Sequence, residues 1–242
     1  MSEMTLEQKE GTSTLQIEAR DRGAWWRPLS IAVTASAMAL ALFMAFVVAP
    51  REATMGDLQR IFYFHVSSSW VGYLALLVTF AASILYLRQG ARRWDIVAVS
   101  STEIGLLFIT QGIISGSIWA RPAWGTWWTW DPRLTTSAVL WLMYTAYLLL
   151  RQAVAEESRR ARLSAVYGVV AFIAVPLNFM AIRWWRAMHP KVLGRTGSGL
   201  TSTMQVVLFV CVAAFTILYV TLLSQRVRLG HLEEDVRQLQ VR

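Results

Sequence analysis

A chain of 242 residues that is 55% hydrophobic and only 16% charged is too apolar to face water over most of its surface, so lipid must be the solvent for much of it. The net charge of +8 lies mainly in short connections between apolar runs, which is typical of membrane orientation and argues against a nucleic-acid partner. The single cysteine, Cys211, lies within an apolar run and can form neither a CxxC pair nor an internal disulfide.

Six apolar stretches follow a polar N-terminal segment. Most are about 18 to 25 residues long, which is enough to cross a hydrocarbon core of ~30 Å, and one is shorter. They lie at 29–49, 62–87, 96–118, 135–150, 165–182 and 203–223. Because backbone groups in lipid need internal hydrogen bonds, and these stretches lack the strict alternation of barrel strands, we predict an all-α fold, a polytopic membrane bundle of six transmembrane helices.

The chain divides into three regions on this basis. We predict a cytoplasmic N-terminal tail over 1–28, a six-span membrane domain over 29–223, and a cytoplasmic C-terminal helix over 224–242. The last prediction rests on an apolar stripe with 3-4-3 spacing, formed by Leu229, Leu232, Val236 and Leu239. Such a helix would lie on the membrane or on a partner.

The distribution of Lys and Arg predicts the orientation of the bundle. The N-terminal tail, the second and fourth connections and the C-terminal end together carry 15 of the 23 basic residues, and the alternate connections carry 8. Because cytoplasmic loops are enriched in Lys and Arg, we predict that both termini are cytoplasmic.

Two histidines lie on the opposite, outer side in this topology. His65 opens the second apolar stretch, and His189 follows the fifth. In a compact bundle both could face one cavity, where neutral imidazoles could ligate a metal from opposite sides. The alternative for each is simpler, because His65 could be an interfacial aromatic residue and His189 a solvated turn residue.

The connection after the third stretch holds five of the 12 tryptophans of the chain, which are Trp119, Trp124, Trp127, Trp128 and Trp130. On a helical turn Trp124, Trp127, Trp128 and Asp131 would share one face, giving a broad indole surface that ends in a carboxylate. We interpret the cluster as a platform for a flat aromatic ligand rather than as an interfacial belt, because a belt would share its aromatic residues among several span ends.

Charged residues near the cluster have two interpretations each. Asp131 precedes Pro132, so it is predicted to cap the N-terminus of the fourth span, a role compatible with orienting a neighbouring histidine or arginine. Four arginines in the outer connections could pair with ligand carboxylates or contact lipid headgroups: Arg121, Arg133, Arg183 and Arg186. Glu103, inside the third span, needs a polar partner or a proton, and either a structural hydrogen bond or a transport role would account for it.

Three motifs resemble those of one family of haem-handling membrane proteins. The run from Trp124 to Thr135 is similar to the tryptophan-rich signature of cytochrome c biogenesis proteins. The segments 62–66 and 183–190, which contain His65 and His189, resemble in particular the cytochrome c maturation protein C family. One position departs from that pattern, because Ser67 follows His65 and Val66 where the resemblance implies proline.

The resemblance implies a non-enzymatic protein of the bacterial inner membrane that holds haem b as transient cargo at the periplasmic face. It implies that His65 and His189 are the axial ligands of the haem iron. It also assigns haem-binding roles to Trp119, Trp124, Trp127, Trp128, Trp130, Asp131 and Arg133. The implied partners, besides the lipid bilayer, are a membrane-anchored haem chaperone, the ATPase and permease subunits of an ABC transporter, and a small single-span subunit.

Two other classes of function compete with haem delivery. A permease for haem or another solute should show inverted repeats or broken helices that meet at the midplane. The only features of this kind in the sequence are Pro176 and Glu103, which lie inside apolar stretches. A transmembrane redox enzyme would need haem ligands near both faces. His231, the only other histidine, lies in the C-terminal region and leaves no relay across a core of ~30 Å.

The predicted orientation can be tested with reporter fusions. A reporter that is active only outside the cytoplasm should be active when fused after Pro190 or within 122–130, and inactive when fused after Gln152, because the basic connections stay inside. The reverse pattern would place the two histidines on the cytoplasmic side and contradict the topology.

Overall fold

The computed structural model describes residues 26–186, 188–189 and 200–240, so most of the predicted N-terminal tail lies outside the described residues. The described chain is helical and contains no strand, and its one β-bridge joins Glu52 to Gly56. The α-helices are α2 (Trp26–Phe43), α3 (Arg60–Gln89), α4 (Arg92–Trp124), α5 (Pro132–Ala153), α6 (Glu157–Ala171), α7 (Ala174–Trp184) and α8 (Ser202–Gln240). A π-helical turn, η1 (Met44–Val48), follows α2, and a 3-10 turn, η2 (Asp57–Gln59), precedes α3.

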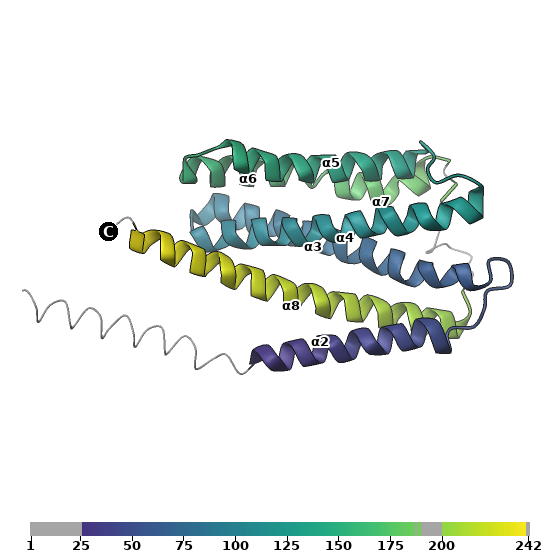
Figure 1. Ribbon diagram of the computed structural model, residues 1–242. Helices are drawn as coiled ribbons and strands as arrows, with labels where there is room; N and C mark the ends of the chain where they lie inside the picture. Colours follow the sequence, from purple (N-terminus) through teal and green to yellow (C-terminus); the bar gives the residue numbers. More distant parts are fainter. Residues whose placement is uncertain (1–25, 187, 190–199, 241–242) are drawn as a thin grey trace, which may run out of the picture.

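These helices run back and forth along one bundle (Figure 1). Among the described residues, six helical segments are long and apolar enough to cross a membrane, which confirms the predicted all-α, six-span fold. The described N-terminal end, Trp26, and the C-terminal end of α8 lie at the same end of the bundle. We call this the arginine-rich end, since Arg92, Arg151 and Arg226 lie there, and the opposite end, which holds His65, the histidine end. Which end faces the cytoplasm stays a prediction.

The fifth span is two helices rather than one. Helix α6 ends at Ala171 and α7 begins at Ala174, with a turn at Phe172 and Ile173 between them. Pro176 explains the break, because proline has no N–H to donate and its ring clashes with the carbonyl four residues before it. Short-range bonds satisfy the turn, from Ile173 N to Val170 O at 3.2 Å and from Val175 N to Phe172 O at 3.0 Å.

The C-terminal segment is helical as expected, but it is the direct continuation of the last span and not a separate helix. Helix α8 runs unbroken for 39 residues, because no proline interrupts it between the apolar run and the C-terminal stripe. Gly230 faces the bundle, where a β-carbon on it would meet Ile96 of α4 at 2.6 Å. The four apolar stripe residues are 39 to 69% exposed, so they point away from the described bundle.

Ion pairs hold the arginine-rich end together. Asp95 of α4 is only 2% exposed and accepts hydrogen bonds from Arg151 of α5 at 2.5 and 2.9 Å, and from Arg92. Arg92 also contacts Glu157 at 2.5 Å and Glu234 of α8 at 3.3 Å. A buried carboxylate needs such partners, since an unpaired charge in a bundle interior is costly.

Glu103 also has a partner. Arg226 of α8 donates to its two carboxylate oxygens at 2.7 and 3.2 Å. The pair joins α4 to α8 toward the arginine-rich end, so the structural interpretation of Glu103 accounts for its position without a transport role.

Among the described helices, α3 and α4 pack together most extensively, along a seam of glycines. A β-carbon on Gly105 would lie 2.9 Å from that of Ala75, and one on Gly72 would lie 2.9 Å from a side-chain carbon of Ile109. On the same face of α4, toward the histidine end, Gly112 approaches Ser69. Small residues let helix backbones approach closely in membranes, where packing rather than water drives association.

Candidate functional site

The glycine seam leads directly to His65, in the second turn of α3. The next glycine of α4, Gly116, lies against the imidazole ring, and a β-carbon on it would meet Cε1 of His65 at 2.8 Å. Nδ1 of His65 lies 2.8 Å from the carbonyl oxygen of Gly112. Because a carbonyl can only accept, Nδ1 carries the proton, and the lone pair of a neutral ring is therefore on Nε2.

The backbone around His65 is regular helix despite the three serines that follow. Their hydroxyl groups donate to the carbonyl oxygens four residues earlier: Ser67 to Tyr63 at 2.6 Å, Ser68 to Phe64 at 2.7 Å and Ser69 to His65 at 2.9 Å. These bonds satisfy polar side chains inside an apolar bundle. The helix that carries His65 is therefore regular with Ser67 in place of the proline that the resemblance implies.

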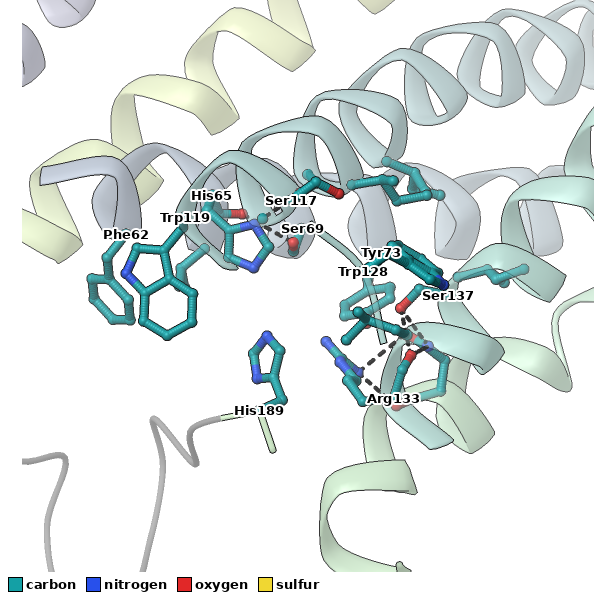
Figure 2. A pocket seen from close by; sticks show the side chains of 18 of the residues that line it. Phe62, His65, Ser69, Tyr73, Ser117, Trp119, Trp128, Arg133, Ser137 and His189 are labelled. Carbon is teal, nitrogen blue, oxygen red and sulfur yellow. Dashed lines mark hydrogen bonds between the residues drawn. The ribbon is translucent and has the colours of Figure 1, made fainter. Parts of the chain in front are cut away.

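His189 faces His65 across a cavity. Their ring centroids are 5.9 Å apart with an interplanar angle of 37°, and Trp124 lies beside His189 with centroids 6.5 Å apart. Figure 2 shows the two imidazoles on opposite sides of an open space. Two imidazoles that bind one iron from opposite sides, with bonds of about 2 Å, place their centroids about 6 Å apart. The separation of the rings is compatible with axial ligation of one iron, and the ligand role itself stays a prediction.

The tryptophan-rich connection is not helical, so the expected indole face of Trp124, Trp127, Trp128 and Asp131 is wrong. Helix α4 ends at Trp124, where Gly125 adopts φ +78° and donates its N–H to Arg121 O at 2.9 Å. Glycine is the usual residue for this left-handed helix end. The chain then stays irregular until α5 begins at Pro132.

The irregular connection sorts the five tryptophans into two groups. Trp119, Trp124 and Trp128 line the cavity, and the rings of Trp119 and Trp124 meet edge to face with centroids 5.1 Å apart. Trp127 and Trp130 are 57% and 76% exposed and do not line it. The structure thus brings three indoles to the histidines and leaves two at the surface.

Asp131 has the capping role that its position predicts. Its Oδ1 accepts hydrogen bonds from the backbone N–H groups of Arg133 at 2.8 Å and Leu134 at 3.1 Å, with Pro132 at the first helical position. It does not line the cavity. Its effect on the site is therefore indirect, since the cap fixes the start of α5 and with it the position of Arg133.

Of the four arginines predicted to lie in the outer connections, Arg133 is the one that lines the cavity. Its Nη1 donates to the backbone oxygen of Asn178 at 2.6 Å and to the Oδ1 of that residue at 3.1 Å. Arg121 instead donates to Gly125 O, Arg183 lies over the ring of Phe179 at 4.8 Å, and Arg186 is exposed.

The empty space of the cavity, including its open mouth, is about 940 Å³. Its walls are mostly apolar and aromatic, from α3, α4, α5 and α7. The indole Nε1 atoms of Trp119 and Trp128 are buried and have no hydrogen-bond partner in the part of the chain that the structure describes. Two unpaired donors in an apolar cavity are suited to a ligand that brings acceptors.

The donor set of the cavity favours a metal that already has ligands of its own. Within 26–186, 188–189 and 200–240, no three side chains of His, Cys, Asp or Glu converge on one point. Two imidazoles alone are too few for the tetrahedral or octahedral shell of a bare ion. They suffice for the iron of a porphyrin, whose ring supplies the other four nitrogens.

Sequence reasoning missed the polar residues of the cavity wall, which include Tyr73 and Asn178, and the glycines Gly112 and Gly116. Helical spacing could have found Tyr73, because residues 65, 69 and 73 follow one face of α3. Asn178 is the single amide side chain within its apolar stretch, and this isolation is the signal that could have marked it. The glycines became informative only when α3 was placed against α4.

Fold and site together define a polytopic helical membrane protein. An aromatic cavity at one end of its bundle lies between two histidines. The chain belongs to the Heme exporter protein C family, whose model matches residues 17–242. It is 34% identical over 216 residues to Heme exporter protein C of Bradyrhizobium diazoefficiens, covering 88% of this chain and 82% of that protein.

More distant relatives show the same relationship. Heme exporter protein C of Haemophilus influenzae is 26% identical over 218 residues, which cover 87% of each chain. A putative cytochrome c biosynthesis ccmC-like mitochondrial protein of Marchantia polymorpha is 26% identical over 178 residues, covering 73% of this chain and 75% of that one.

Proposed function

We propose that this protein binds haem in transit between His65 and His189 and delivers it for the maturation of c-type cytochromes. The observation that carries the proposal is the pairing of the two imidazole rings, 5.9 Å apart, across a cavity with tryptophan walls. The names of the relatives, Heme exporter protein C, support a haem cargo. The cargo is haem b, whose flat apolar ring fits a cavity lined by indoles.

The site works at the periplasmic face of the bacterial inner membrane in this proposal. The charge distribution supports this orientation, since it places the histidine end outside. Haem held there is presented to a membrane-anchored haem chaperone. The protein works beside separate subunits in this proposal, namely an ABC ATPase, its permease partner and a small single-span protein.

The exposed tryptophans give the chaperone a place to dock. Trp127 and Trp130 lie in the connection that also carries Trp128, a cavity residue, but their rings are turned outward. Exposed tryptophans are frequent energetic anchors of protein interfaces. A partner bound to Trp127 or Trp130 would lie close to the cargo, because Trp128 of the same connection lines the cavity.

A permease remains the second candidate, because the fifth span is broken between α6 and α7. Broken helices line the substrate sites of many transporters. Here, however, short-range bonds satisfy the turn at Phe172 and Ile173, and the main cavity lies at the histidine end. Purified protein in sealed vesicles distinguishes the two functions, since a delivery protein alone should not carry haem across the bilayer.

The histidine variants test the binding site. His65→Ala and His189→Ala should each retain part of the bound haem with an altered absorption spectrum, because one axial position becomes water or empty. The double variant should lose the six-coordinate spectrum. Maturation of c-type cytochromes should fall in each single variant. Wild-type spectra and full maturation in both single variants would show that neither histidine is a ligand.

Gly116→Ala tests the placement of His65 without removing it. The new β-carbon would lie 2.8 Å from Cε1 of the imidazole, so the ring must turn and its bond to Gly112 must weaken. We expect a spectrum close to that of His65→Ala although both histidines are present. Ile114→Ala, two residues earlier and 55% exposed on the same helix, is the control and should keep the wild-type spectrum. Equal spectra for both variants would contradict the contact.

Trp127→Ala tests the docking surface separately from haem binding. Co-purification with the haem chaperone should weaken by about fivefold or more, the loss typical of an interfacial anchor, while the haem content stays near that of the wild type. Trp128→Ala should lower the haem content and leave co-purification with the chaperone near that of the wild type, because Trp128 lines the cavity. Unchanged chaperone capture by Trp127→Ala would exclude it as an anchor.

A further inference from the structure

The cavity has one polar side. Of the described residues that line it, Arg133 is the one with a permanent charge. In Figure 2, Arg133 lies on one side of the histidine pair, and Phe62 and Trp119 lie on the other. A ligand held between the imidazoles therefore meets a cation at one edge and the aromatic rings of Phe62 and Trp119 at the opposite edge.

Asn178 of α7 is the centre of the polar side and is only 1% exposed. Its Oδ1 accepts hydrogen bonds from the hydroxyl group of Tyr73 and from Arg133. Its Nδ2 donates to Thr136 Oγ1 at 2.8 Å and to Ser137 Oγ at 3.0 Å. One amide thus joins α3, α5 and α7 at the wall of the cavity.

These bonds hold the Arg133 guanidinium by one of its three nitrogens. Both bonds from the guanidinium to Asn178 come from Nη1. Within the described residues, no carboxylate pairs with Arg133, and its guanidinium also lies beside Tyr73, with the central carbon 5.9 Å from the ring centroid. Because neither bond to Asn178 uses Nε or Nη2, the guanidinium can still receive a planar, bidentate acceptor, the arrangement that arginine and a carboxylate form best.

We propose that Asn178 is a positioning residue that holds Arg133 as the receptor for a carboxylate group of the cargo. The inference rests on the proposed function, since it assumes that a porphyrin lies between the histidines. Both carboxylates of haem are on one edge of the ring. Binding of that edge at Arg133 fixes the in-plane orientation of the macrocycle and turns the opposite, hydrocarbon edge toward Phe62 and Trp119.

The test compares haem with its dimethyl ester, which has the same ring and iron but no carboxylate. Purified full-length protein in detergent is titrated with each compound, and the absorption spectrum reports both affinity and axial ligation. The wild type should prefer free haem by about 10- to 100-fold, the range expected for hydrogen bonds between charged groups. Both compounds should give the same six-coordinate spectrum, because the histidines do not contact the carboxylates.

Three variants assign the preference to the proposed residues. Arg133→Gln removes the charge, Asn178→Leu releases the guanidinium, and Asn178→Asp neutralises it with a carboxylate of the protein. Each should bring the preference for free haem close to 1 while the ester keeps its affinity and spectrum. Gln111→Leu removes an amide from an exposed position on α4 and should keep the wild-type preference.

The outcomes separate the inference from the proposed function. Equal wild-type affinity for haem and its ester, both six-coordinate, would overturn the carboxylate receptor and leave haem binding in place. A wild-type preference retained in either Asn178 variant would overturn the role of Asn178. Failure of the wild type to give a six-coordinate spectrum with either compound would contradict the proposed function itself.

Discussion

The close contact between α3 and α4 is the constraint on which the site depends. Gly105 and Gly72 let the two backbones approach to a distance that any larger side chain would prevent. The same approach brings Gly112 and Gly116 against His65, so that a backbone carbonyl sets the tautomer of the ring and the missing β-carbon makes room for it. The glycines of the seam therefore determine both the packing of α3 against α4 and the tautomer of His65.

The other walls of the cavity come from elements far apart in the chain, and local contacts hold each of these elements in place. The cap at Asp131 fixes the start of α5 and the direction of Arg133. The break before Pro176 separates α7 from α6, and Asn178 then ties α7 to α3 and α5. The cavity consequently combines apolar walls, which suit a flat ring, with a single polar side that distinguishes one edge of that ring from the other.

Much of this architecture could be predicted from the sequence, because lipid imposes simple rules. Six apolar stretches predicted six helical spans, and the pair of Asp131 and Pro132 predicted a helix cap. The tryptophan face failed, since helical spacing was assumed across Gly125, a residue that ends helices. The roles of Asn178 and Gly116 depend on contacts between helices. Arg133 and Asn178, for example, are 45 residues apart in the chain, and no local sequence pattern contains such a contact.

The ion pairs at the arginine-rich end form two layers with different sensitivity to ionic strength. Asp95 and Arg151 are 2% and 11% exposed, so dissolved ions screen this pair much less, and α4 stays joined to α5 when salt is added. Arg237 and Glu157, at 46% and 36% exposure, are open to counterions. Added salt therefore loosens the attachment of the C-terminal part of α8 first, while the base of the bundle keeps its charges paired.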